Sequence, residues 1–176
     1  MNKDIARLQL IAERFSKIGS APELTEQDVC PIVQRVGAYF RHRTSSRVTI
    51  TVSVPSQAVT ARVNAPLLEW VFENLCKNAI DAMQGAGNLT LTLKESAIVE
   101  KRKRYLRVEV SDTGKGIAKK HFQRVFKPGF TTKRRGWGLG LSLAKRIVEE
   151  YHHGRIYVLA SEVGQGTTFA VDIEQC

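Results

Sequence analysis

The chain has 176 residues, of which 43% are hydrophobic, and its 27 Lys and Arg against 17 Asp and Glu give a formal net charge of +10. This length suffices for a core of its own, and the three widely spaced cysteines argue against a disulfide framework or a zinc site. The cysteines favour a reducing, cytoplasmic compartment, and because no apolar run approaches the roughly 20 residues of a membrane span, we expect a soluble polypeptide. The positive charge suits an anionic partner without choosing among nucleic acid, membrane, nucleotide and acidic protein.

The first part of the chain predicts two helices and two strands. Apolar residues at helical spacing predict a helix over 1–19, whose apolar stripe suits packing on this domain or on a partner. A polar linker over 20–27 then leads to a second helix over 28–42. From residue 47 the apolar period changes to strict alternation, which predicts a strand over 48–54 and a shorter one over 59–63.

The longest predicted helix runs from Asn64 to about Gly85, because Asn-Ala-Pro is a helix start signal and glycines end helices. The elements expected after it are strands over 88–94 and 105–111, a helix over 139–152, and strands over 156–160 and 167–173. This order predicts a two-layer α/β sandwich, with one mixed sheet of about five strands and three main helices on one face.

A basic run occupies residues 100–104, between two predicted strands. We interpret it as the solvated tip of a hairpin. A nucleic-acid site is the weaker reading, because base stacking needs interleaved aromatic residues and only Tyr105 is close.

Three polar residues of the long helix align beside its apolar face. Asn74, Asn78 and Asp81 follow one another at i, i+4 and i+7, which places two amides and a carboxylate on one narrow stripe. Asparagine is a poor residue for the middle of a helix. Surface drift and oxygen ligands for Mg²⁺ both remain open as explanations.

Asp112 continues the inward parity of the strand before it, so its carboxylate points toward the buried side where the strand ends. A buried carboxylate needs a partner. It either caps the Thr-Gly-Lys-Gly turn or accepts a hydrogen bond from an exocyclic amine such as that of adenine. In the second reading, Gly114 and Gly116 keep side chains away from a planar ligand.

A second glycine cluster, Gly136, Gly138 and Gly140, precedes the helix that begins near Leu141. Free backbone N–H groups and the positive end of a helix dipole at such a place favour an anion. Three basic residues, at 133–135, lie just before it. A glycine triplet alone is weak evidence for a nucleotide, and the order of all the motifs in one chain strengthens it.

Taken together, the motifs resemble the catalytic ATP-binding domain of sensor histidine kinases, in the GHKL group that also includes gyrase-type topoisomerases, heat-shock chaperone ATPases and mismatch-repair ATPases. The resemblance covers about residues 31–176 and implies the Bergerat-type ATP-binding fold. It rests on five ordered motifs: 73–83 (ENLCKNAIDAM), 112–117 (DTGKGI), 126–133 (FKPGFTTK), 136–141 (GWGLGL) and 164–169 (GQGTTF).

The resemblance implies ATP and Mg²⁺ as cofactors and a role for each matching residue. Asp112 would bind the adenine amine, with Thr167 near the same edge through water, and Asn78 would coordinate Mg²⁺. Asn74 and Lys77 would lie near the phosphate chain, and Lys133 with the backbone of 138–141 would hold the outer phosphates under a mobile lid over 118–137. The residues expected at the nucleotide are Asn74, Asn78, Asp81, Asp112, Gly114, Gly116, Ile117, Phe126, Thr131, Thr132, Lys133, Gly136, Gly138, Leu139, Gly140, Leu141 and Thr167. The catalytic residues expected are Asn74, Lys77 and Lys133.

One position separates a kinase from a hydrolase. In the hydrolysing relatives, the residue one turn before the metal-binding asparagine is a glutamate that activates water, whereas here it is Asn74. An amide cannot act as a base, and the neighbouring Glu73 lies about 100° round the helix. The resemblance therefore implies a kinase that hands its γ-phosphoryl to a partner.

The sequence departs from the family pattern in three places. Trp137 stands where a small residue is usual, and His153 stands where a glycine is common. No phosphoacceptor histidine box is present, since His42, His121, His152 and His153 all lie elsewhere.

We therefore expect a fragment of a longer kinase. Residues 1–19 would end a dimerisation hairpin, 20–30 would be a linker, and 31–176 the catalytic domain. The expected partners are the hairpin that carries the acceptor histidine and the receiver domain of a response regulator, in a homodimeric parent that is either soluble or membrane-anchored. We expect no nucleic acid and no direct membrane contact. The alternatives are an ATP-driven switch, such as an anti-sigma serine kinase or chaperone-type ATPase, and a basic nucleic-acid module.

Overall fold

The computed structural model describes residues 22–96, 101–130 and 140–176. The longer elements are β1 (Thr25–Asp28), α2 (Cys30–Arg43), β2 (Val48–Ser53), β3 (Thr60–Val63), α3 (Ala65–Ala82), β4 (Gly87–Glu95), β5 (Tyr105–Asp112), α4 (Gly140–Arg146), β6 (Arg155–Glu162) and β7 (Gly166–Glu174). Two single 3₁₀ turns, η1 (Lys119–His121) and η2 (Arg124–Phe126), and one π-helical turn, η3 (Ile147–Tyr151), complete the described part.

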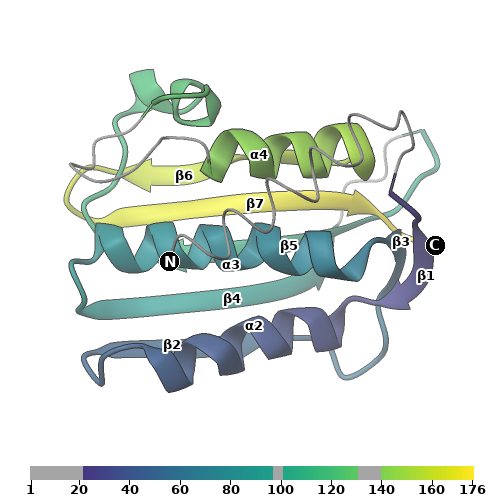
Figure 1. The fold of residues 1–176 in the computed structure, drawn as a ribbon, viewed down its shortest axis with the longest axis horizontal. Helices are drawn as coiled ribbons and strands as arrows, with labels where there is room; N and C mark the ends of the chain where they lie inside the picture. Colours follow the sequence, from purple (N-terminus) through teal and green to yellow (C-terminus); the bar gives the residue numbers. More distant parts are fainter. Residues whose placement is uncertain (1–21, 97–100, 131–139) are drawn as a thin grey trace.

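Five of these strands form one mixed sheet, in the order β2-β4-β5-β7-β6. Strand β2 runs parallel to β4, and every other neighbouring pair is antiparallel. Helices α2, α3 and α4 lie side by side over one face of the sheet (Figure 1). The predicted two-layer sandwich is thus confirmed, and β1 pairs with β3 in a separate two-stranded sheet.

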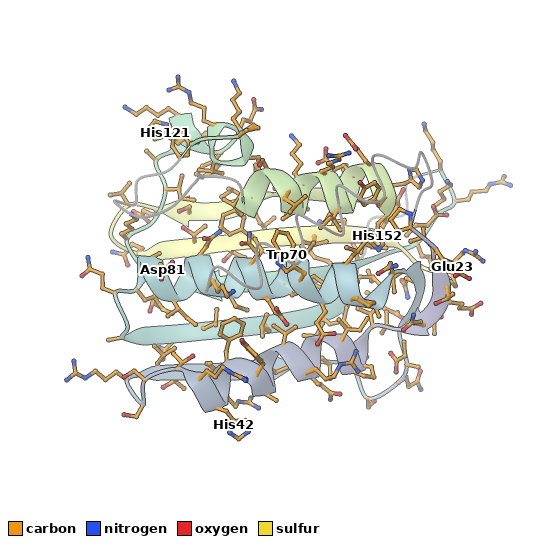
Figure 2. All side chains as sticks on the ribbon, viewed as in Figure 1. Glu23, His42, Trp70, Asp81, His121 and His152 are labelled. Atoms are coloured by element: carbon orange, nitrogen blue, oxygen red, sulfur yellow. The ribbon has the colours of Figure 1, made fainter. Side chains whose placement is uncertain are left out.

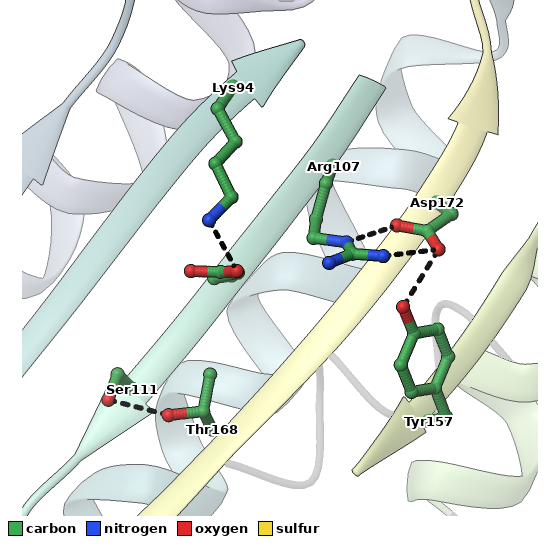
Figure 3. A network of polar contacts seen from close by, with 7 residues as sticks. Lys94, Arg107, Ser111, Tyr157, Thr168 and Asp172 are labelled. Atoms are coloured by element: carbon green, nitrogen blue, oxygen red, sulfur yellow. Dashed lines mark hydrogen bonds and ion pairs between the residues drawn. The ribbon is translucent and has the colours of Figure 1, made fainter. Parts of the chain in front are cut away.

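Alternation of apolar and polar residues decides which face of the sheet the helices cover. Leu106, Val108 and Val110 of β5 are buried beneath α3, whose inward face is also apolar. The opposite face is polar, and its side chains form hydrogen bonds with one another. The Arg107 guanidinium donates to both oxygens of Asp172, and the Tyr157 hydroxyl donates to the same carboxylate (Figure 3). This face needs no cover, so two layers suffice.

Helix α3 begins where its sequence predicts and ends slightly earlier than expected. The Asn64 side chain accepts a hydrogen bond from the Leu67 N–H at 3.1 Å, and a proline stands in the first turn. At the other end Gln84 and Gly85 have positive φ angles, which stops the helix three residues before the predicted end.

Residues 25–28 were expected within a polar linker and instead form β1, paired antiparallel with β3. Their exposed, polar side chains carry no alternating apolar pattern, so the sequence does not reveal the strand. Backbone pairing holds it, together with Asp28, whose Oδ1 accepts hydrogen bonds from the N–H groups of Cys30 and Val59 at 3.1 Å each.

The helix predicted over 139–152 is regular only to Arg146 and then widens into η3. His152 stabilises the π-helical turn, because its backbone N–H and its ring Nδ1 are both within hydrogen-bond distance of the carbonyl oxygen of Ile147, at 3.2 and 2.9 Å. Its Nε2 accepts from the N–H of Asn64 at 3.1 Å, so the ring joins the end of this helix to the start of α3. The next residue, His153, takes the left-handed conformation with φ of 54°, which fits a place where glycine is common.

Residues 101–104 are exposed next to β5, which agrees with a solvated hairpin tip. His42 is exposed as well. The helix predicted over 1–19 lies outside the described residues. Among the helices that the structure describes, none is both long and apolar enough to cross a membrane.

Candidate functional site

Asp112 is the last residue of β5, and its side chain is only 6% exposed. Its Oδ1 accepts a hydrogen bond from the Gly114 N–H at 2.8 Å, so the capping reading holds. Burial raises the pKa of Asp112 above its usual value, and the N–H groups of Gly114 and Thr167 offset part of that rise. An ionised carboxylate has about four acceptor positions, so two bonds to N–H groups leave room for a ligand's donor.

The first glycine cluster is needed for packing of the chain on itself. A Cβ at Gly114 would lie 2.6 Å from the carbonyl carbon and oxygen of Ala82, at the end of α3. A Cβ at Gly116, where φ is 76°, would collide with the carbonyl oxygen of Glu162 in β6. Backbone packing is thus a further reason for both glycines, and their place beside a planar ligand stays a prediction.

Thr167 lies directly opposite Asp112 in the pairing of β5 with β7, and it is 4% exposed. Its hydroxyl oxygen is 2.8 Å from that of Ser161 in β6. Ser161 also accepts from the Ile117 N–H at 2.7 Å and donates to the Gly166 carbonyl at 2.9 Å. One serine thus connects the glycine turn that follows Asp112 to the strand that carries Thr167.

Sequence reasoning missed Ser161, and a bulge explains why. The pairing of β6 with β7 shifts between Val158 and Ala160, so Leu159 is extra. Without the shift, Ser161 would point to the open face of the sheet. The shift puts Ser161 opposite Thr167. Alternation of apolar and polar residues along the sequence does not reveal the shift, so it does not predict this pair.

Asn74 and Asn78 form an amide stripe along α3, and Asn74 faces the start of α4. Asn74 is 9% exposed, and a Cβ at Gly140 would lie 2.5 Å from its Oδ1. Among the described residues, its Nδ2 finds no hydrogen-bond partner, and a buried donor left without one is costly. Lys77 and Asn78 are half-buried on the following turn, and Figure 2 shows the exposed Asp81 at the C-terminal end of α3.

These residues suit a magnesium ion held together with phosphate. The described residues contain no cluster of three or more His, Cys, Asp or Glu side chains, so they offer no all-protein cage for a metal. Mg²⁺ keeps several waters and usually binds one or two protein oxygens plus substrate phosphates. The amide oxygen of Asn78 fits that donor set, and the unpartnered Nδ2 of Asn74 can donate a hydrogen bond to a phosphate oxygen.

The segment 118–130 was expected to form the first part of a mobile lid with Phe126 at the nucleotide. In the structure, Phe126 is a core residue, whose ring meets that of Phe169 in β7 edge to face at 6.0 Å. The Lys145 ammonium lies 5.8 Å from the same ring, and Val125 is buried beside it. These contacts anchor the segment through an aromatic side chain, and a contact of Phe126 with the nucleotide stays a prediction.

Several predicted site residues lie outside the described part of the chain: Thr131, Thr132, Lys133, Gly136, Gly138 and Leu139. The basic loop and most of the second glycine cluster therefore stay predictions. Of their neighbours, Gly140 begins α4 against Asn74, and Leu141 is partly buried on the core.

The structure thus gathers two groups of predicted residues. Asp112, Thr167 and the turn at 114–117 form a corner between the ends of β5, β6 and β7. Asn74 and Asn78 lie along α3, which the turn touches through the bond from the Lys115 N–H to the Ala82 carbonyl at 3.0 Å. An acceptor corner and an amide stripe on adjoining elements could hold a ligand with a donor at one end and anionic oxygens at the other.

Comparison with known proteins agrees with this arrangement. The family model for the histidine kinase-, DNA gyrase B- and HSP90-like ATPase matches residues 63–175. The sensor histidine kinase ZraS of Salmonella typhi is 39% identical over 174 residues, which cover 97% of this chain and 36% of that protein. Sporulation kinase E of Bacillus subtilis (strain 168) is 39% identical over 106 residues, 60% of this chain and 13% of that protein. The chain spans little more than a third of these curated relatives at most.

Solved structures show the same fold. The catalytic domain of histidine kinase ThkA, in a nucleotide-free form, has a TM-score of 0.75 at 25% identity and covers 88% of this chain and 99% of that one. Full-length ShkA in complex with AMPPNP has a TM-score of 0.74 at 27% identity and covers 92% of this chain and 34% of that one. The family model matches well over half of the chain, so the protein belongs to the histidine kinase-, DNA gyrase B- and HSP90-like ATPase family.

Proposed function

We propose that this chain is the ATP-binding catalytic domain of a two-component sensor histidine kinase, which transfers the γ-phosphoryl of ATP to a histidine on a dimerisation hairpin. The observation that carries the proposal is the acceptor corner at Asp112 and Thr167, set beside the amide stripe of α3 within a family of ATPases. The neighbour ShkA was solved in complex with AMPPNP, which supports a nucleotide as the ligand.

The adenine end of the nucleotide belongs at Asp112. Its carboxylate keeps acceptor capacity beyond its bonds to N–H groups, and an exocyclic amine supplies a matching donor. The buried position makes this recognition strong, since neither partner keeps its water.

The phosphates belong along α3 and at the start of α4. Asn78 would hold Mg²⁺, which neutralises charge on the phosphate oxygens when it is bound. The unpartnered Nδ2 of Asn74 would donate to a phosphate oxygen, and Lys77 and Lys133 would add positive charge nearby. Backbone N–H groups at 138–141 complete this proposed phosphate end.

Transfer to a partner fits the site better than hydrolysis does. Asn74 is buried where a hydrolase of this family would need its base, and an amide cannot take a proton from water. What the described residues can do is orient a nucleotide and balance its charge, which is most of what phosphoryl transfer requires.

The proposed partners follow from this chemistry. The acceptor is a histidine of a hairpin whose last turns would be residues 1–19, joined through a linker over 20–30 to the domain over 31–176, in a homodimeric parent. A response regulator receiver domain would take the phosphoryl next. The ThkA kinase of the same fold was solved in complex with the response regulator protein TrrA, which supports such a partner. We place the domain in the cytoplasm, without direct contact to nucleic acid or membrane.

A binding experiment tests the proposal on this chain alone. We expect AMPPNP to raise the melting temperature, and to raise it more with Mg²⁺ than without. The Asn78→Ala variant should lose the Mg²⁺-dependent part and keep the rest. We also expect negligible phosphate release from ATP without an acceptor. If no nucleotide raises the melting temperature, the proposal is wrong. Steady release of phosphate from ATP would favour an ATP-driven switch.

A further inference from the structure

Ser161 is a half-buried residue of β6 that makes three hydrogen bonds within the Asp112 corner. Its Oγ lies 2.7 Å from the Ile117 nitrogen, 2.9 Å from the Gly166 carbonyl oxygen and 2.8 Å from the Thr167 hydroxyl. Two of these partners have fixed roles, because the N–H group can only donate and the carbonyl can only accept.

The fixed roles decide the direction of the third bond. A serine hydroxyl has one proton and two acceptor lone pairs. The proton of Ser161 goes to Gly166 and one lone pair receives the Ile117 N–H, so one lone pair remains. All three bonds form together only when Thr167 donates its own proton to Ser161. The Thr167 hydroxyl then offers acceptor lone pairs and no donor.

The consequence reaches Asp112, which lies opposite Thr167 in the sheet and is itself an acceptor. Both side chains are almost fully buried, so water cannot easily correct a mismatch. An amino group meets two acceptors favourably. A carbonyl oxygen in the same place meets acceptors only.

We infer that Ser161 is a positioning residue for base selection: by holding the Thr167 proton it makes the corner accept only, and so favours a purine with a 6-amino group over one with a 6-oxo group. The inference rests on the proposed function, which places the base at Asp112. It goes beyond that function by assigning the selectivity to a residue that need not touch the nucleotide.

The test compares the affinities of ATP and ITP for the intact chain and its Ser161→Ala variant. The two nucleotides differ in the group at C6 and in the N1 proton that accompanies the 6-oxo group. In the variant the Thr167 hydroxyl is free to turn and donate to the 6-oxo group. We expect the ATP-to-ITP affinity ratio to fall roughly tenfold, because one buried hydrogen bond is gained for ITP. In a Thr167→Val background, Ser161→Ala should leave the ratio unchanged, since no hydroxyl remains to turn. If Ser161→Ala does not fold, Ser161→Cys, similar in size and weak in hydrogen bonding, should lower the ratio too.

Ser111 provides a matched control. It forms the same kind of cross-strand pair with Thr168, the next residue of β7, at 2.8 Å but on the open face of the sheet (Figure 3). The Ser111→Ala variant should keep the wild-type ATP-to-ITP ratio. An unchanged ratio in Ser161→Ala, or an equal change in Ser111→Ala, would overturn the inference while ATP binding upholds the proposed function. Failure of the wild-type chain to bind either nucleotide would overturn both.

Discussion

At the scale of single residues, Asp112 combines a poor environment for a charge with a good one for a ligand. Burial raises the pKa of its carboxyl group, so the ionised form costs stability, and the N–H groups of Gly114 and Thr167 offset part of that cost. A group held in this way is typical of binding sites, where the missing stabilisation comes from the ligand.

We therefore predict opposite effects of Asp112→Asn on binding and on stability. Asparagine can still accept from the Gly114 N–H, and it carries no charge, so the melting temperature should stay the same or rise. Its NH₂ group would face the adenine amine, donor against donor, and ATP affinity should fall roughly 10- to 100-fold. Calorimetric titration with AMPPNP and a thermal melt measure the two effects.

The control is Asp172→Asn, the same change in a buried carboxylate on the other face of the sheet. Asp172 binds Arg107 and Tyr157, so its loss should lower the melting temperature and leave the affinity of the folded protein for AMPPNP unchanged. Wild-type affinity in Asp112→Asn would remove that residue from the base-binding role.

At the scale of elements, the segment 118–130 buries two side chains, Val125 and Phe126, and its other residues are exposed or partly buried. Phe126 is its main buried side chain, set against Phe169 of β7, while the residues of η1 are exposed or partly so. The stability of this segment should therefore depend on one ring more than on its own two short turns.

Phe126→Ala should lower the free energy of unfolding by about 3 kcal/mol, as loss of a buried aromatic ring does. Denaturant titration measures it, with Phe130→Ala as the control, because Phe130 is only partly buried and its ring meets that of His121 at a tilt of 45°. The control should lose clearly less. An equal loss in both variants would contradict the anchoring role of Phe126.

His152 links two helices and should make the stability of the domain depend on pH. Burial lowers its pKa below 6.5, and its Nε2 accepts from Asn64 only when it carries no proton. The unfolded chain therefore binds the proton more readily than the folded one. This contribution to stability is present above about pH 6.5 and is lost as the pH falls through the lower, folded-state pKa.

Thermal melts between pH 7.5 and 5 measure this dependence. The His152→Asn variant should be less stable at pH 7.5 and should change less across the interval. His153→Asn should keep most of the wild-type slope, because the charge of the exposed His153 is the smallest of the causes that shift the pKa of His152, and asparagine tolerates its left-handed backbone. Equal slopes in wild type and His152→Asn would show that another group is responsible.

The elements also show how far the sequence predicts this fold. Alternation of apolar and polar residues correctly predicted that Asp112 points inward, and Asn-Ala-Pro correctly predicted the start of α3. Both predictions depend on local patterns of the sequence. The strand β1 and the place of Ser161 depend on pairing with distant strands and on a bulge, which leave no local pattern. The sequence also does not reveal the close packing of Gly114 on Ala82, because Ala82 approaches Gly114 only in the folded chain.

At the scale of the whole molecule, charge is concentrated where the anionic ligand is proposed. Residues 113–148 contain ten Lys and Arg and no Asp or Glu, while the rest of the chain carries 17 of each. The formal net charge of +10 therefore belongs entirely to the stretch between the two glycine clusters and the helix that follows. Such a field raises the local concentration of anions and speeds their binding.

One measurement tests most directly whether the γ-phosphoryl group of ATP is transferred to a histidine. The chain is incubated with Mg²⁺ and γ-labelled ATP, with and without a separately produced dimerisation hairpin from the parent kinase. We expect label on a hairpin histidine, its loss in the Asp112→Asn and Asn78→Ala variants, and little free phosphate without the hairpin. Free phosphate released at one rate with or without the hairpin, and no labelled histidine, would contradict the proposed transfer.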